Sequence, residues 1–335
     1  MANVTYLIGA GASAGKRVKT NGQIIEGLPC VKEIPKRLST LSSQFNSAKS
    51  NFSGARRSDI ENLNTTISKL FEASSRHSTI DTYAKKLFLR NEQNEFMSLE
   101  KNLAFYFVIE QILLKPDSRY DTFLANILTN KLEIPDNINI ISWNYDNQFE
   151  IAYQEYTKEK TLPIASKKLW NKDVRPKILK VNGTAAFEGM DNISSLREKY
   201  PSLSSSFGRG ADEIDYNRMA YILDLFMKLH KGEVGMTQLS FAFEGLCNDS
   251  LYQVADEIVE KTDVLVVIGY TFPFFNREID RRLLNRIDNN NSKIYIQDIS
   301  PERIKQSIKA VLPDFKESNF ILLNDVDQFF LPPEL

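Results

Sequence analysis

The sequence predicts an α/β fold: a Rossmann-like six-stranded parallel sheet with helical insertions that form a second, smaller subdomain. Helix-like stretches separate six short apolar runs, and several runs are continuous rather than alternating, as expected for strands buried on both faces of a parallel sheet. The first run leads straight into a Gly-x-Gly loop, a common feature of such sheets. The six runs cover residues 4–9, 138–143, 177–181, 263–269, 293–298 and 319–323.

The first run ends in the loop Gly-Ala-Gly-Ala-Ser. Its glycines leave no side chain in the way of a ligand, and free N–H groups at the start of a helix favour a pyrophosphate. We therefore expect a helix to begin in this loop. We also expect the pyrophosphate of a dinucleotide to bind at the five loop residues, Gly9, Ala10, Gly11, Ala12 and Ser13.

Two related motifs fit less well. A dinucleotide-binding dehydrogenase carries an acidic residue about 20 positions after the glycines, but residues 20–35 contain several Gly and Pro residues and are typical of a loop. Gly15 and Lys16 resemble the end of an ATPase P-loop, yet Arg17 stands where the magnesium-binding Ser or Thr is needed. The sequence argues against both classes.

Long insertions interrupt the predicted sheet. We expect one domain over residues 1–335, because connections of this length must form structure of their own and pack against the sheet. The core covers about 1–30, 130–187 and 246–335, and the helical insertions cover about 31–129 and 188–245. Helical patterns are found at 80–90, 96–114, 213–230, 254–261 and 301–312. The two insertions are expected to pack together as one helical layer.

The composition excludes several classes of protein. The chain has 42 Lys and Arg against 43 Asp and Glu, and its basic residues are dispersed, which argues against binding to nucleic acid or to an acidic membrane. Cys30 and Cys247 lie far apart and have no metal-ligand spacing, so we expect no disulfide framework and no metal. No apolar run approaches the roughly 18 residues of a membrane helix, and a cytoplasmic location is expected.

Four of the predicted strands end in polar or glycine-rich segments: GAGAS at 9–13, WNYDNQFE at 143–150, VNGT at 181–184 and GYTF at 269–272. Ligands of open α/β sheets bind at the carboxyl ends of the strands. Any one of these segments alone would be read as a turn. Four in order predict a common binding site.

In this combination the chain resembles the SIR2 superfamily, and specifically the SIR2-like NAD⁺-consuming effectors of bacterial antiphage defence. The family's glycine-alanine-glycine-x-serine loop matches residues 9–13, and its asparagine-hydrophobic-aspartate motif matches Asn144, Tyr145 and Asp146. The later glycine-x-serine/threonine strand end and the region that contacts the adenosine ribose are matched by Gly269, Tyr270 and Thr271, followed by Phe272, and by Asp298.

The resemblance implies roles for the central motif. Asn144 would position the attacking water and the ribose, and Asp146 would face the nicotinamide carboxamide or the developing positive charge. The alternative is that both residues form an Asx-turn after a strand.

The chain departs from the family at one position. Where the family has lysine-x-histidine-glycine, this chain has Lys180, Val181, Asn182 and Gly183. An amide accepts no proton near neutral pH, but the oxygen of Asn182 can bond a ribose hydroxyl. The chain has two histidines. His77 is interpreted as a loop histidine that caps a helix, the alternative being that it replaces the missing base, and His230 is interpreted as the end of a helix.

The resemblance therefore predicts an NAD⁺ glycohydrolase that releases nicotinamide and ADP-ribose, with NAD⁺ as substrate. Such an enzyme would be an abortive-infection effector, activated by another protein subunit that senses infection or by homo-oligomerisation. The alternative is an inactive subunit that binds NAD⁺ or ADP-ribose and has a regulatory or structural role. A protein deacylase is disfavoured, because classical sirtuins carry a four-cysteine zinc module and this chain has two cysteines.

Overall fold

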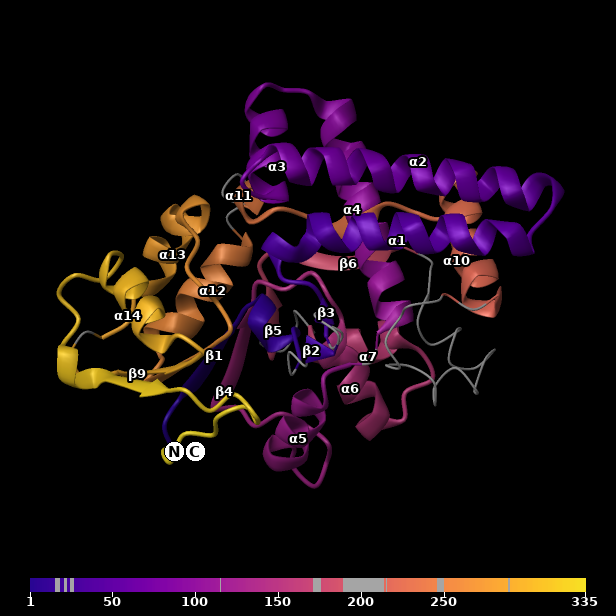
Figure 1. Cartoon of the computed structure of the whole chain (residues 1–335). Coiled ribbons are helices and arrows are strands. Elements are labelled where there is room, and N and C mark those ends of the chain that lie inside the picture. Colours follow the sequence, from indigo (N-terminus) through magenta and orange to yellow (C-terminus); the bar gives the residue numbers. More distant parts are fainter. Residues whose placement is uncertain are drawn as a thin grey trace.

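A parallel six-stranded sheet forms the centre of the computed structural model (Figure 1). The structure describes residues 1–15, 19–20, 23–24, 27–114, 116–170, 176–188, 214, 216–245, 250–288 and 290–335. The strands of the sheet are β1 (Val4–Ile8), β4 (Ile138–Ser142), β5 (Ile178–Lys180), β8 (Val264–Ile268), β9 (Lys293–Gln297) and β10 (Phe320–Leu323). All six predicted strands are thereby confirmed.

The strand order is β10-β9-β8-β1-β4-β5. The chain runs outward from β1 through β4 to β5 and then returns to place β8 on the other side of β1, which is the doubly wound Rossmann arrangement. Val4 of β1 lies opposite Ile138 on one side and Val264 on the other. Connections leave the sheet in opposite directions at β1 and β8, so a crevice opens between the carboxyl ends of these two strands.

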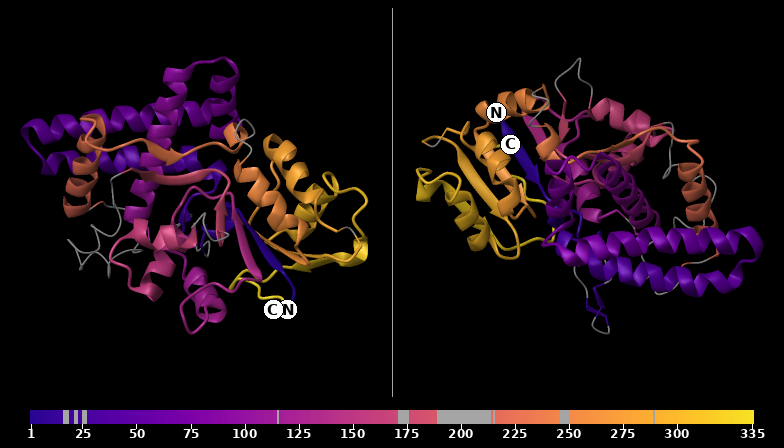
Figure 2. Two further views of the ribbon diagram at one scale, coloured as in Figure 1. Left: turned by 180° about the vertical axis from the view of Figure 1, so that it is seen from behind. Right: turned by 90° about the horizontal axis from the view of Figure 1, so that it is seen from above.

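Helices cover both faces of the sheet (Figure 2). Leu7 and Val267 pack on one face with α12 (Ser250–Glu260), α13 (Arg277–Leu284) and α14 (Pro301–Lys309). Tyr6 and Val266 pack on the other face with α5 (Ser118–Ile127), α6 (Gln148–Thr157) and α7 (Leu162–Leu169). Neighbouring strand residues thus enter opposite cores, which explains why the strand sequences are apolar without alternation.

Five further helices form a layer beside the sheet, in which α1 and α2 lie side by side (Figure 1). The layer contains α1 (Ile34–Ala48), α2 (Gly54–Arg76), α3 (Ile80–Leu89), α4 (Gln93–Leu113) and α10 (Tyr216–His230). These helices share one apolar cluster, to which both predicted insertions contribute. Most of α4 is buried from Leu103 onward, as befits the centre of this layer.

Smaller elements complete the fold. An antiparallel ribbon of β6 (Gly183–Phe187) and β7 (Thr237–Leu239), not predicted from the sequence, joins the helical layer to the end of β5 and precedes the short α11 (Ala242–Gly245). A second ribbon pairs β2 (Lys19–Thr20) with β3 (Gln23–Ile24).

One expectation for the loop after β1 is wrong. The predicted helices at 96–114, 254–261 and 301–312 correspond to α4, α12 and α14. Among the described residues after β1, however, a three-residue 3-10 turn, η1 (Ala10–Ala12), stands where the helix was expected, and no α-helix precedes the one that begins at Ile34.

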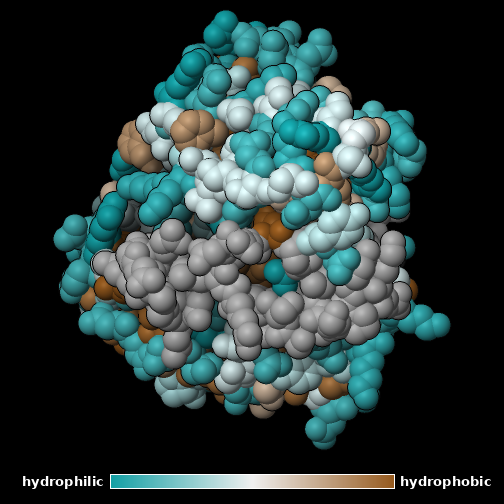
Figure 3. Space-filling view, turned by 45° about the vertical axis from the view of Figure 1, so that its right-hand side comes forward, coloured by the Kyte–Doolittle hydropathy of each residue, from teal (hydrophilic) through white to brown (hydrophobic). Residues whose placement is uncertain are grey.

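The two chain termini lie close together (Figure 1). The face in Figure 3 is largely hydrophilic outside its grey atoms, with apolar residues scattered over it. Across the described ranges, no helix combines the length and the apolar composition that a membrane crossing requires.

Candidate functional site

A cavity of about 800 Å³ lies at the carboxyl ends of the central strands. This volume falls within the range of roughly 300–1,000 Å³ that is usual for small-molecule sites. Gly9 and Ala12 do not line it; all the other predicted site residues do, namely Ala10, Gly11, Ser13, Asn144, Asp146, Asn182, Gly269, Tyr270, Thr271, Phe272 and Asp298. Residues that follow five strands, β1, β4, β5, β8 and β9, are therefore brought together at the carboxyl edge of the sheet.

The glycines of the β1 loop allow it to touch the loop after β8. The Gly9 N–H donates to Ile268 O at 3.0 Å, and the Gly11 N–H donates to Gly269 O at 2.9 Å. A Cβ on Gly11 would lie 2.7 Å from Gly269 Cα, and one on Gly9 would lie 2.6 Å from Tyr270 Cα. A larger residue at Gly11 would thus collide with backbone and disturb the packing of the two loops.

These contacts also decide which amides are available to a ligand. The N–H groups of Ala12 and Ser13, like those of the two glycines, donate to backbone carbonyls. These four N–H groups are therefore not free, as a helix start would have left them, and the binding of a pyrophosphate at residues 9–13 stays a prediction. Within 9–13 of the described chain, the N–H of Ala10 is the one without a hydrogen bond.

The β8 loop offers more free donors. Over the described residues, the N–H groups of Tyr270, Thr271 and Phe272 bond to no protein acceptor. Gly269 and Phe272 both have left-handed backbone, with φ of 61° and 49°. Successive free amides in such a loop form a concave site that suits an anion.

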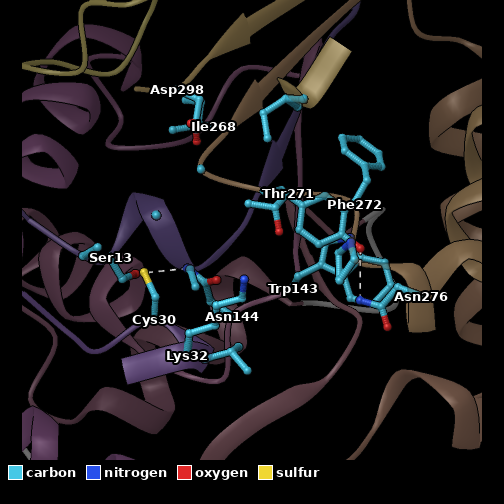
Figure 4. Close-up of a pocket in the computed structure, with 18 of the residues that line it drawn as sticks. Ser13, Cys30, Lys32, Trp143, Asn144, Ile268, Thr271, Phe272, Asn276 and Asp298 are labelled. Carbon is cyan, nitrogen blue, oxygen red and sulfur yellow. Dashed lines mark hydrogen bonds between the residues drawn. The ribbon is translucent and has the colours of Figure 1, made fainter. Parts of the chain in front are cut away.

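Asn144 is held at the floor of the cavity. Its Nδ2 donates to Ser13 Oγ at 3.0 Å (Figure 4), and Ser13 Oγ is 2.9 Å from the Tyr120 hydroxyl. The Asn144 N–H donates to Ser142 Oγ at 3.2 Å. Its amide oxygen accepts no hydrogen bond from the described residues and remains available to a ligand.

Asp146 lies over a buried group of charges. Its Oδ1 accepts the Gln148 N–H at 3.0 Å, so Asp146 forms the Asx-turn that was the alternative to a functional role. The residue nevertheless also lines the cavity. The Lys180 ammonium donates to the Asp146 carbonyl and lies 3.4 Å from Glu150 Oε1. Burial raises the pKa of both carboxyls, and the charge of Lys180 opposes that rise.

The Asn182 carboxamide already has two protein partners. Its Nδ2 donates to Trp143 O at 2.8 Å, and its Oδ1 accepts the Ala242 N–H at 2.9 Å. The side chain thereby ties the end of β4 to the segment that follows β7. Its contact with a ribose hydroxyl stays a prediction.

The two ends of the cavity differ in character. At the inner end the Trp143 ring stacks on Tyr270, with centroids 4.9 Å apart, and the Tyr270 hydroxyl donates to Asp280 Oδ1 at 2.9 Å. Asp298 lies across the open space from Asn144 and Trp143 (Figure 4). One of its carboxylate oxygens accepts the Ser300 N–H at 2.9 Å.

Sequence reasoning missed Arg119, which fixes the β1 loop. Arg119, on α5, is 5% exposed; its Nη2 donates to Ala12 O at 3.0 Å and to Gly11 O at 3.3 Å. Asp117 pairs with its guanidinium at 2.6 Å. The sequence around Arg119 carries no motif, and the contact depends on the packing of α5 against the sheet.

Asp81, at the start of α3, was also missed as a site residue. It lines the cavity, and its Oδ1 accepts the Tyr145 hydroxyl at 2.6 Å. The sequence signals a helix start here, because Thr79 caps the N-terminus of α3. It does not signal that this helix faces the strand ends.

Neither histidine lines the cavity. His77, the C-cap residue of α2, places Nδ1 2.9 Å from Ala73 O, and His230 at the end of α10 places Nδ1 3.0 Å from Phe226 O. The helix-end interpretation of both is confirmed. In the described part of the chain no group of three or more His, Cys, Asp or Glu residues is placed to hold a metal ion; Cys247 lies outside it.

No protein-family model matches the chain, and neither does any curated protein sequence. The case for a function therefore depends on the motifs and on the geometry of the cavity.

Proposed function

We propose that the chain binds NAD⁺ in this cavity and hydrolyses it to nicotinamide and ADP-ribose. One observation carries the proposal: Asn144, Asp146 and the loops after β1 and β8, which are widely separated in sequence, surround one cavity at the switch point of a Rossmann sheet. Nucleotides bind at this point in doubly wound folds.

The cavity suits an extended dinucleotide with its adenosine at the Asp298 end. An acidic residue after a strand bonds ribose hydroxyls in such folds, and Asp298 keeps one carboxylate oxygen beyond its bond to Ser300. The free N–H groups of residues 270–272 and of Ala10 would bind the pyrophosphate. The nicotinamide ribose would then lie beside Asn144 and Trp143.

The chemistry at the inner end needs a held water and a site for positive charge. When the bond from ribose to nicotinamide breaks, the leaving group becomes neutral and the ribose becomes cationic. The free oxygen of Asn144 would accept a bond from the attacking water or a ribose hydroxyl, and the buried carboxylate of Asp146 would stabilise the cation. Positioning of this kind supplies much of the rate when the leaving group is good.

Asn182 acts in this proposal as a positioning residue. Its bonds to Trp143 and Ala242 hold the backbone next to Asn144. The identity of this residue favours a second candidate function. Because the residue at the family's histidine position offers no proton acceptor, the chain would be a subunit that binds NAD⁺ or ADP-ribose without cleaving it.

We further propose a cytoplasmic antiphage effector that is inactive until a partner protein or self-assembly activates it. An enzyme that consumes NAD⁺ must be held inactive in a healthy cell. The isolated chain should then release nicotinamide slowly, and the activated complex should release it rapidly.

The test is nicotinamide release from NAD⁺ by the purified chain, with and without the proteins that co-purify with it, alongside calorimetry with ADP-ribose. Release that increases with the partner supports the hydrolase. Binding of ADP-ribose with no release in either preparation selects the binding subunit. No binding and no release would reject the site.

A further inference from the structure

Asp81 is a carboxyl group that the proposed mechanism does not yet use. It belongs to the helical layer, lines the cavity and is 8% exposed. One carboxylate oxygen accepts the Tyr145 hydroxyl at 2.6 Å, and Oδ2 has no hydrogen-bond partner among the described residues. An unpaired buried carboxylate oxygen costs free energy, so its retention in a binding cavity calls for a functional reason.

Its location links it to the reacting end of the ligand. Tyr145, which bonds Asp81, is the central residue of the motif whose flanking members are Asn144 and Asp146. Phe107, which packs on the Tyr145 ring with centroids 5.3 Å apart, also lines the cavity. Asp81 is therefore joined through Tyr145 to the motif of Asn144 and Asp146, and it lines the same cavity.

We propose that Asp81 is the proton acceptor of the hydrolysis, in place of the histidine that this chain lacks. The inference rests on the proposed NAD⁺ glycohydrolase function. A water oxygen bonds to C1′ of the nicotinamide ribose, and the bond from C1′ to the pyridinium nitrogen breaks. The bonding electron pair leaves with nicotinamide, which becomes neutral, and the water proton passes to the Asp81 carboxylate and then to solvent.

Other carboxyl groups of the cavity are less suited. Asp146 accepts the Gln148 N–H, and Lys180 opposes the rise of its pKa. Asp298 lies across the cavity from Asn144 (Figure 4). Asp280 accepts a hydrogen bond from the Tyr270 hydroxyl, which itself accepts one from Asn276. These three residues belong to the segment that follows β8.

The surroundings of Asp81 suit a base. Burial raises its pKa above the ordinary value, and the bond from Tyr145 opposes this rise. Among the described residues, the titratable groups that interact with the pair are Tyr270, whose pKa the charge of Asp81 raises, and Glu100 and Glu244, whose charges raise the pKa of Tyr145. A general base is most effective when its pKa approaches the working pH, and such a group contributes about 10²–10⁴-fold to the rate.

The test compares the pH profile of kcat for nicotinamide release by the activated complex in four proteins. Asp81→Asn should lower kcat by about 100-fold or more and leave ADP-ribose affinity unchanged. It should also abolish the acidic limb of the profile, which is the fall of kcat at low pH as the base becomes protonated. Tyr145→Phe keeps the ring but removes a bond that favours the ionised carboxyl, so the acidic limb should move to higher pH. Asp280→Asn, a matched buried carboxyl bonded by a tyrosine, should keep the wild-type limb.

The proposal is overturned if folded Asp81→Asn keeps the wild-type kcat and limb, or if the limb disappears in Asp280→Asn instead. An unshifted limb in an active Tyr145→Phe protein also contradicts it. Wild-type protein that binds ADP-ribose but releases no nicotinamide overturns the proposed function, and this role of Asp81 with it.

Discussion

The inner and outer ends of the cavity are built differently. At the inner end Trp143, Asn144 and Tyr145 follow one central strand, are nearly fully buried and are held by hydrogen bonds or ring stacking. At the outer end Phe274 and Ile299 are 82% and 81% exposed, although both line the cavity. The inner end is pre-organised for chemistry, and the outer end is an open apolar rim that is suited to binding a base.

This contrast predicts different consequences of mutation. Changes at the inner end should alter stability or turnover, because its groups are interdependent and desolvated. Changes at the rim should alter affinity alone, because its side chains make few contacts within the protein.

The largest effect is expected at Lys180, beneath the inner end. Lys180→Met leaves Asp146 and Glu150 buried without their cation, which should lower the free energy of unfolding by about 3–5 kcal/mol. The pKa of both carboxyls is raised in the folded protein, and loss of Lys180 raises it further. The loss of stability should therefore be greatest at high pH, where both carboxyls must ionise, and should diminish as the pH falls through their pKa values.

Urea unfolding at several pH values measures this effect. Lys180→Arg, which keeps the charge, is the matched control and should be less destabilised. A loss in Lys180→Met that does not depend on pH would mean that the ionic group does not stabilise the inner end.

A smaller effect is expected at Asn182. Asn182→Ala leaves the Ala242 N–H and the Trp143 carbonyl without their partner, at about 1–3 kcal/mol each. Thermal or urea unfolding should show this loss, and turnover should fall less than in Asn144→Ala. A turnover loss as large as that of Asn144→Ala, without loss of stability, would give Asn182 a direct role in the reaction.

The smallest effect is expected at the outer rim. Phe274→Ala should weaken the binding of ADP-ribose about 10-fold, the scale of one base stacking on an aromatic ring. Nicotinamide mononucleotide, which lacks the adenosine, is the control ligand, and its affinity should not change. Equal weakening of both ligands in calorimetry would show that the rim does not bind the adenine.

The sequence predicted the sheet well, because continuous apolar runs such as VLVVI in β8 are typical of strands buried on both sides. It also placed Asn144 and Asp298 at one edge, since parallel strands end together. It did not predict how the β1 loop is held, because the bonds from Gly11 to Gly269 and from Arg119 to Ala12 join distant segments. Asp81 was missed as a site residue for the same reason: the packing of the helical layer brings it to the cavity.

The central claim is that the inner end of this cavity cleaves NAD⁺. The most direct measurement is nicotinamide release by the activated complex containing wild-type chain or Asn144→Ala, with ADP-ribose affinity measured on both. The wild-type chain should release nicotinamide and ADP-ribose in equal amounts, and Asn144→Ala should be slower by at least ~100-fold, the scale of losing one transition-state hydrogen bond, with its affinity retained. Equal release by the two proteins would contradict the account.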